Sequence, residues 1–173
     1  MNRAKWLGLA LALGSLPALA DVSVDMNRLT DQGTSEAVGA VTFKDTDYGL
    51  LITPDIHGLP AGSMHGFHLH QNSSCQPSVS EGKTTPGGAA GGHFDPAGNG
   101  LHAGPYVKES HLGDLPVLMA DARGNAATPV LAPRLRESDL SGHALIIHEG
   151  GDTYGEPPKL GGGGARWACG VVR

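Results

Sequence analysis

Short segments in which apolar residues alternate with polar or small ones recur along the chain, and residues typical of turns separate them. The period of two is visible in residues 22–26 (VSVDM) and again in residues 37–43. This period is typical of β-strands that bury one face. We predict about eight strands, at residues 22–29, 37–43, 48–53, 65–71, 116–120, 127–131, 144–148 and 167–172.

The alternation predicts antiparallel pairing, and only residues 135–140 have a pattern that would allow a short helical turn. Two stretches rich in glycine, proline and polar residues, 72–114 and 149–164, interrupt the strands. Loops of this length in a compact protein are usually functional or disordered. With 27 glycines, 12 prolines and few aromatic residues, the 173-residue chain is expected to form one all-β domain.

The first twenty residues have the composition of a secretory signal peptide. Arg3 and Lys5 precede an apolar run at residues 6–13, and the segment ends in Ala18-Leu19-Ala20. The apolar run is too short to span a bilayer. We therefore expect a signal peptide at residues 1–20 and a mature domain at residues 21–173, exported to the periplasm in preference to the medium.

Charge argues against two classes of partner. Without Arg3 and Lys5 the chain has 10 basic and 17 acidic side chains, which gives a formal charge of about −7. Nucleic acids attract basic surfaces, and binding to anionic lipid needs a cationic helix or a polybasic run. We expect no nucleic-acid partner and no membrane attachment after cleavage of the signal peptide.

Two histidines lie two residues apart in one predicted strand, at His68 and His70. This spacing places both imidazoles on the same side of a strand, where they can bind one metal ion together. An HxH pair also occurs by chance, so the pair alone is weak evidence. Four further residues in the long loop, His93, His102, His111 and Asp114, follow at intervals of nine, nine and three.

Three imidazoles and one carboxylate form a tetrahedral zinc set, and a bound ion would organise a loop that has little else to order it. Solvated loop histidines are the alternative interpretation. His148 ends another apolar strand and can face the HxH pair. His68, His70 and His148 with a nitrogen from His93 form an all-nitrogen set that suits copper(II). His93 would then serve both metals as imidazolate.

Asp152 follows His148 by four residues and comes directly after Gly150 and Gly151. A carboxylate there can orient metal-bound imidazoles through hydrogen bonds, although an ordinary loop aspartate is the alternative.

The chain has two cysteines, Cys75 and Cys169. In an exported protein without a CxxC motif they are expected to form one disulfide, with two free thiols as the alternative.

Five ordered motifs resemble the copper/zinc superoxide dismutases, particularly the exported bacterial branch: HGFHLH (65–70), GGHFDP (91–96), HLGDLP (111–116), IHEGGD (147–152) and GGGGARWACGVV (161–172). The resemblance implies an eight-stranded Greek-key barrel or flattened sandwich with two long functional loops. It implies copper on His68, His70, His93 and His148, and zinc on His93, His102, His111 and Asp114. It also implies the disulfide, a bridge by Asp152 between a copper ligand and a zinc ligand, and Arg166 beside the copper.

The implied reaction is the dismutation of superoxide to dioxygen and hydrogen peroxide, with copper cycling between Cu(II) and Cu(I). His93 would carry a proton to the departing peroxide, and Arg166 would attract the anion. Lys83 is a second candidate for steering the substrate. A copper and zinc storage protein needs the same ligands, but it has no use for Arg166 or for an open copper position.

Three other histidines are assigned no metal. His65 is expected to form hydrogen bonds with nearby backbone, and His57 and His143 are expected to lie at the surface. Whether either surface histidine binds an additional ligand is left undecided. The assembly is also open, with a homodimer favoured over a monomer.

Overall fold

The computed structural model describes residues 22–173. The predicted signal peptide at residues 1–20 lies outside these residues. Eleven strands form within them, where about eight were predicted: β1 (Val22–Thr30), β2 (Gly33–Thr46), β3 (Gly49–Ile56), β4 (Met64–His65), β5 (Phe67–His70), β6 (Ser78–Ser80), β7 (Lys83–Thr85), β8 (Leu118–Met119), β9 (Val130–Ala132), β10 (Ala144–His148) and β11 (Arg166–Val171).

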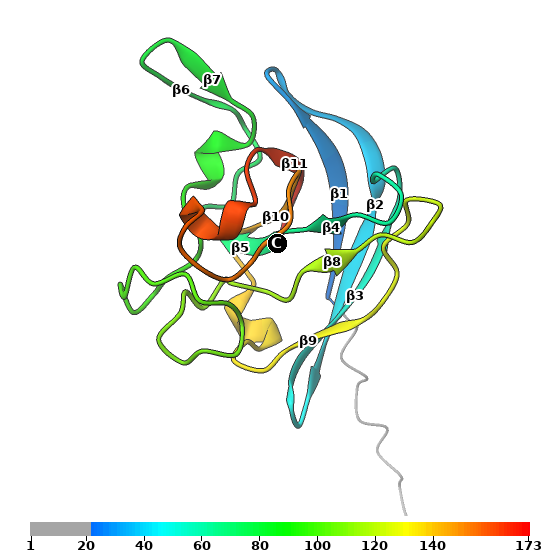
Figure 1. The fold of residues 1–173 in the computed structure, drawn as a ribbon, viewed down its shortest axis with the longest axis vertical. Helices are drawn as coiled ribbons and strands as arrows, with labels where there is room; N and C mark the ends of the chain where they lie inside the picture. The colour runs from blue at the N-terminus through cyan, green and yellow to red at the C-terminus, as the bar shows by residue number, and fades with distance from the viewer. Residues whose placement is uncertain (1–21) are drawn as a thin grey trace, which may run out of the picture.

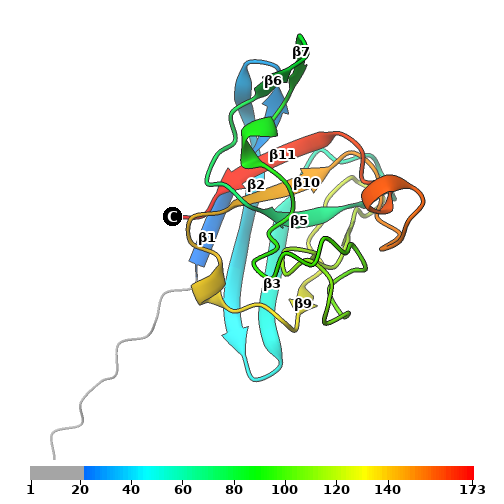
Figure 2. The ribbon, with the colours of Figure 1, turned by 90° about the vertical axis from the view of Figure 1, so that its left-hand side faces the viewer.

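Seven strands form one curled antiparallel sheet in the order β5-β10-β11-β1-β2-β3-β9 (Figures 1 and 2). The region of β8 closes the gap between the two ends of this sheet. β8 pairs with β4, which continues β5 across Gly66, and farther along the chain Ala126 bridges Ile56 at the end of β3. The predicted all-β class and its antiparallel sheet are confirmed.

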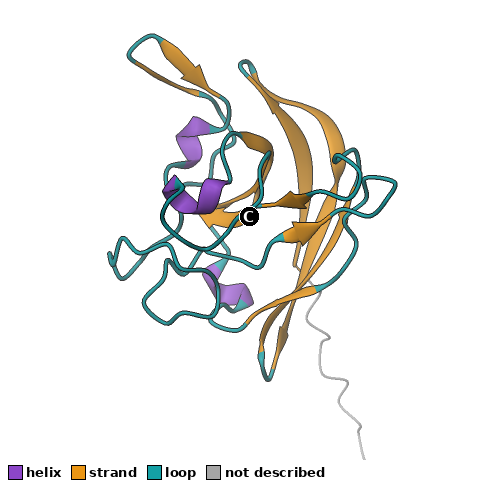
Figure 3. Ribbon diagram, in the orientation of Figure 1, coloured by secondary structure: helices purple, strands orange, loops and turns teal. Residues whose placement is uncertain are grey.

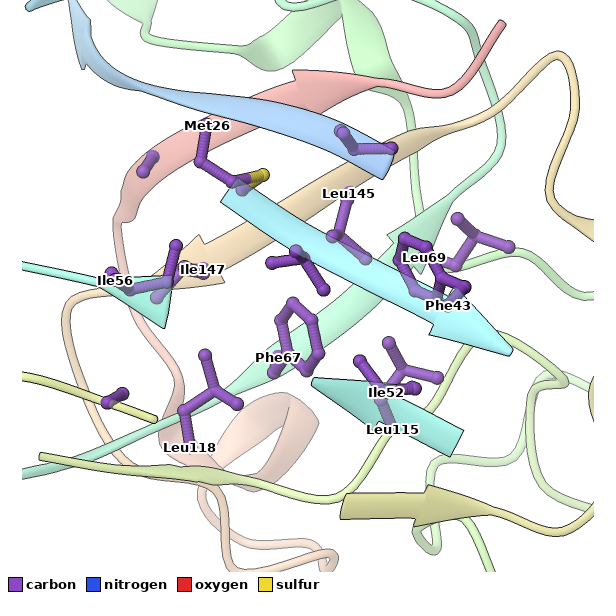
Figure 4. Packing of buried hydrophobic residues seen from close by; sticks show 14 of the residues in the cluster. Met26, Phe43, Ile52, Ile56, Phe67, Leu69, Leu115, Leu118, Leu145 and Ile147 are labelled. Carbon is purple, nitrogen blue, oxygen red and sulfur yellow. The ribbon is translucent and has the colours of Figure 1, made fainter. Parts of the chain in front are cut away.

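The interior of the curled sheet is filled with large apolar side chains (Figure 4). Phe67 and Leu69 of β5 face Leu145 and Ile147 of β10, and each of the four is fully buried. Burying one such side chain contributes about 1.5–3 kcal/mol relative to exposing it. The core therefore gives β5 and β10 fixed positions, and these strands carry three of the predicted copper ligands.

A β-bulge interrupts the predicted alternation of buried and exposed residues in β2. Val41 and Phe43 are buried as the period of two predicts, but nearer the start of the strand Val38 is buried while Ala37 is exposed. The register between β1 and β2 shifts at Met26/Asn27, opposite Gly39. A Cβ at Gly39 would lie 1.9 Å from the carbonyl oxygen of Asp55, so only glycine allows the strands to approach there.

The two long irregular stretches contain more structure than was predicted. A hairpin of β6 and β7 projects from the body of the molecule (Figure 1), and 3-10 turns form at Gly88–Ala90 and Lys159–Gly162. The turn expected within residues 135–140 is a 3-10 turn at Glu137–Asp139. In Figure 3 most of the loop segments lie on the side of β5 and β10, away from β2 and β3.

The predicted disulfide between Cys75 and Cys169 is present, with the Cα atoms 5.7 Å apart. It joins the loop after β5 to β11 and packs in a small second cluster with Leu29, Ala90 and Ile146. Residues 71–92 are thereby fastened to the sheet. Within residues 22–173, no helix has the length and apolar character needed to cross a bilayer.

Candidate metal centre

His68 and His70 occupy alternate positions in β5, and both side chains are buried on the face opposite to Leu69. Leu69 enters the core, so the two imidazoles necessarily point to the other side of the strand. His148 reaches the same region from the end of the neighbouring β10, where a register shift follows Ile147. Its backbone N–H donates to the carbonyl of Gly66 at 2.8 Å, which fixes the end of β10 against β5.

His93 joins these three from the long loop, through a bridge that pairs its backbone with that of His70. One nitrogen from each of the four imidazoles lies within 4.8 Å of the others, and all four residues are buried. The structure thus brings together the four predicted copper ligands, His68, His70, His93 and His148.

Three of these imidazoles each have one nitrogen fixed by a hydrogen bond. Nδ1 of His70 lies 2.9 Å from the carbonyl oxygen of Gly91, and Nδ1 of His148 lies 3.2 Å from that of Gly164. A carbonyl oxygen only accepts, so the ring proton resides on Nδ1 and the lone pair on Nε2. Nε2 of both rings is buried without a hydrogen-bond partner among the described residues.

His68 has the same arrangement with its nitrogens exchanged. Nε2 donates to Asp152 at 2.8 Å, and Nδ1 is buried without a partner in the described chain. Burial lowers the pKa of His68 to about 3 and that of His148 to about 4, which keeps both rings neutral at neutral pH. Neutral imidazoles with lone pairs directed at one point fit a metal ion with nitrogen ligands.

The carboxylate of Asp114 is the meeting point of the second predicted set. Its Oδ1 lies 2.8 Å from Nδ1 of His93, 3.1 Å from Nδ1 of His102 and 3.3 Å from Nδ1 of His111. Burial alone would raise the pKa of Asp114, but hydrogen bonds from imidazoles and from Ser110 outweigh it and hold the pKa well below its usual value. An ionised carboxylate among three imidazole nitrogens fits zinc.

The tightest group around Asp114 differs slightly from the predicted one. Donor atoms of His68, His93, His102 and Asp114 lie within 4.8 Å of one another, and His111 lies outside this group. His111 still contacts Asp114, and its ring centroid is 5.3 Å from that of His93. His93 belongs to both sets, and its ring stacks on that of His68 at 3.9 Å.

Asp152 connects the two sets through its two oxygens. Oδ2 accepts from Nε2 of His68 at 2.8 Å, and Oδ1 accepts from Nε2 of His102 at 3.0 Å. A Cβ at Gly161 would lie 1.8 Å from Oδ1, which explains why the glycine run after residue 160 must have no side chain here. The predicted position of Asp152 as an orienter of imidazoles is consistent with this geometry.

Arg166 begins β11 directly opposite His148 in the register with β10. Its guanidinium donates to the carbonyl oxygens of Gly87 and Gly91, and the Gly91 oxygen is also the acceptor for His70. The positive charge of Arg166 contributes to lowering the pKa of His70 and of His148, after burial, the larger cause. A fixed cation therefore adjoins two of the four predicted copper ligands.

The other predicted positions have separate outcomes. His65 is buried and its Nδ1 bonds the carbonyl oxygen of His148 at 2.7 Å, as expected, and His57 is exposed. His143, which was expected at the surface, is only partly exposed. Its ring is partly buried against Phe94, at 4.0 Å between centroids, and its Nδ1 bonds the carbonyl oxygens of residues 70 and 71. Lys83 is exposed on the projecting hairpin (Figure 2).

Sequence reasoning missed Ser110, which is buried beside the second set. Its hydroxyl donates to Oδ2 of Asp114 at 2.5 Å and accepts from the backbone N–H of Ala103 at 2.7 Å. The position directly before His111 was the one available signal. The carbonyl oxygens of Gly91 and Gly164, which accept hydrogen bonds from imidazoles, were also missed. Every residue type has a backbone carbonyl, so the sequence does not show which one acts as an acceptor.

Known proteins resemble this chain over nearly all of its length. The family model of copper/zinc superoxide dismutase matches residues 37–172. The superoxide dismutase [Cu-Zn] of Photobacterium leiognathi is 48% identical over 177 residues, which cover 100% of both chains. Two solved structures each cover 89% of this chain and 100% of their own. The Cu/Zn superoxide dismutase from Brucella abortus is 40% identical with a TM-score of 0.85, and the monomeric copper, zinc superoxide dismutase from Salmonella enterica is 47% identical with a TM-score of 0.79.

These likenesses agree with the imidazoles and carboxylates that the fold gathers around His93. The chain belongs to the copper/zinc superoxide dismutase family.

Proposed function

We propose a role for each site residue of this chain in superoxide dismutation, the activity of its family. Copper and zinc are the cofactors, and superoxide is the substrate. Bound copper would supply a one-electron redox couple suited to the dismutation of superoxide, and bound zinc would supply a fixed positive charge. We assign copper to His68, His70, His93 and His148, and zinc to His93, His102, His111 and Asp114.

One observation carries the copper assignment. Nδ1 of His68, Nε2 of His70 and Nε2 of His148 are buried without partners in residues 22–173, while the opposite nitrogen of each ring is fixed by an acceptor. Leaving three such atoms unpaired costs free energy unless a ligand binds them. The fixed tautomers point the lone pairs inward, so the chain is prepared for a metal before it arrives.

His93 is the proton carrier in this proposal. Its Nδ1 lies 2.8 Å from the carboxylate of Asp114, and its ring is stacked on His68 between the two sets. Nε2 is therefore the atom at which a proton is held and passed to the peroxide product. Asp114 keeps the ring in one orientation while Nε2 gains and loses that proton.

Arg166 binds and orients the anionic substrate. Its guanidinium is held by the carbonyl oxygens of Gly87 and Gly91, at a place where its charge acts on His70 and His148. A guanidinium remains charged at every relevant pH, so this attraction is constant. We also propose that Lys83 steers superoxide from a distance, since surface charge raises the rate at which a small anion arrives.

Two further proposals concern the whole protein. Residues 1–20 are proposed to direct export to the periplasm, on the basis of their charged, apolar and small-residue regions. A homodimer is proposed as the assembly. This differs from the Salmonella enterica protein, which is described as monomeric. Light scattering coupled to gel filtration distinguishes 1 subunit from 2 on this chain.

Metal analysis and superoxide dismutation measured on the same purified sample test the assignment. We expect one copper and one zinc per subunit, with His148→Ala losing copper and His111→Ala losing zinc. His57→Ala is the matched control, because that histidine is exposed and lies in neither set. A loaded protein without turnover would support the metal-storage alternative, and zinc retained unchanged by His111→Ala would contradict the zinc assignment.

A further inference from the structure

Arg134 makes a set of hydrogen bonds that metal binding by the neighbouring loop does not by itself require. Nε donates to the carbonyl oxygen of Pro105 at 2.9 Å, and one Nη atom donates to that of His111 at 2.6 Å. The other Nη atom donates to the carbonyl oxygens of Ser110 at 2.9 Å and Lys108 at 3.4 Å. One guanidinium thus binds four carbonyl oxygens of a single loop.

All four acceptors lie in the segment that runs from one proposed zinc ligand, His102, to the next, His111. This segment forms no strand. One backbone hydrogen bond joins its two ends, from the N–H of His111 to the carbonyl oxygen of Leu101 at 2.8 Å. Pro105, Ser110 and His111 are buried, so their carbonyl oxygens need partners inside the protein. Arg134 supplies a partner to each of the three, and the carbonyl oxygen of His111 also accepts from the backbone N–H of Asp114 at 3.2 Å.

The base of the Arg134 side chain is fixed to the barrel and not to the loop. Ala132, two residues before it, pairs with Leu50 in the main sheet, and Leu135, directly after it, is buried in the core. Burial lowers the pKa of Arg134, and the carboxylate of Asp114 works in the opposite direction. Because Arg134 follows β9 closely, its guanidinium holds the loop in a fixed position relative to that strand. It also adds positive charge near the carboxylate of Asp114, a proposed zinc ligand.

We propose that Arg134 is a positioning residue for the zinc set, which holds the loop between His102 and His111 near its metal-bound shape before zinc arrives. The proposal rests on the zinc assignment made above. Arg134 touches neither the proposed ligand atoms nor the copper set, so its effect passes through the backbone of the loop. Because a guanidinium presents five N–H donors in one plane, a lysine at this position cannot reproduce the contacts.

Arg134→Met tests the proposal in the full mature chain, with Zn(II) and Co(II) as probes. We expect Arg134→Met to weaken zinc binding by about 10- to 100-fold, as loss of a residue that orients ligands does, and to alter the visible absorption of Co(II) bound in place of zinc. Hydrogen exchange of residues 103–111 in the metal-free protein should accelerate. Arg134→Lys should lie between Arg134→Met and the parent chain.

Arg136→Met is the matched control, because Arg136 is exposed and bonds the carbonyl oxygen of its own neighbour, Leu135. The proposal is overturned if Arg134→Met binds zinc and Co(II) as the parent chain does, or if both methionine variants lose affinity equally. If Arg134→Met fails to fold, the same readouts on Arg134→Lys decide. Failure of the parent chain to bind zinc through His111 would instead overturn the zinc assignment itself.

Discussion

Nε2 of His68 lies 2.8 Å from Oδ2 of Asp152, and both side chains are buried. The other oxygen of Asp152 accepts from His102, so a single carboxylate orients one proposed ligand of each metal. We predict that Asp152→Ala weakens the binding of both copper and zinc by about 10- to 100-fold. Competition against chelators, with copper and zinc measured separately, checks this.

Asp55 provides the matched control for Asp152. Its carboxylate lies 3.3 Å from the exposed imidazole of His57, so the same chemical pair occurs there outside both proposed metal sets. Asp55→Ala should leave both affinities unchanged. Asp152→Asn should have an intermediate effect, because the amide retains one acceptor oxygen. Loss of only one metal in Asp152→Ala would contradict the bridging role.

Arg166→Met should lower the rate of dismutation at low ionic strength by about 10-fold or more while both metals remain bound. The physical reason is the loss of the fixed cation beside His70 and His148. Salt should slow the variant less than it slows the parent chain, since salt screens charge. Rates measured by pulse radiolysis from low to high salt provide the check, and equal rates would refute the role of Arg166.

The period of two in the sequence predicted most of the strands, because a strand with one face in the core must alternate apolar and polar positions. The same pattern could not show that His65–Gln71 divides at Gly66, or that β6 and β7 pair within the long loop. Short strands of two or three residues contain too few positions for a period to appear. The shift at Val38 was also hidden, since a β-bulge depends on how two strands pair.

The sequence identified the proposed metal ligands as candidates because imidazoles and carboxylates have few other reasons to recur in such loops, and their order matched a family pattern. The tautomers were not predictable. They depend on the carbonyl oxygens of Gly91 and Gly164, which any residue type can supply. Arg134 was missed for a similar reason, as its partners are backbone atoms of residues 105–111 that are distant in sequence.

Removing the disulfide with Cys75→Ser and Cys169→Ser should lower the free energy of unfolding by about 2–5 kcal/mol. The bond fastens residues 71–92 to β11, and this segment includes Gly87 and Gly91, the acceptors for Arg166. Turnover should therefore also fall at temperatures where the variant is folded. Denaturant unfolding and rate measurements on the same samples check both effects, and full activity would show that Arg166 is held without the disulfide.

Lys83→Ala should flatten the dependence of rate on salt without changing metal content, because Lys83 would act only through its charge. Lys44→Ala is the control, since Lys44 is exposed on β2 and carries the same charge. Rates across a range of ionic strength distinguish the two. Identical salt dependence in both variants would remove Lys83 from the steering role.

The metal-free protein should be most stable near pH 6.5 and lose stability on both sides. Burial lowers the pKa of His68 to about 3 and of His148 to about 4, so the folded state binds fewer protons than the unfolded chain below about pH 6.5. The free energy of unfolding then falls as the pH drops toward 4.

His102 acts on the alkaline side. Burial lowers its pKa, but hydrogen bonds to Asp114 and Asp152 outweigh burial and raise it to about 9. The stability that this protonated imidazole contributes is complete below about pH 6.5 and is lost as the pH rises through 9. Denaturant midpoints of the metal-free protein from pH 4 to pH 9 measure both arms. His57→Ala should leave the profile unchanged because His57 is exposed, whereas a flat profile in the parent chain would mean that these imidazoles do not titrate as their surroundings require.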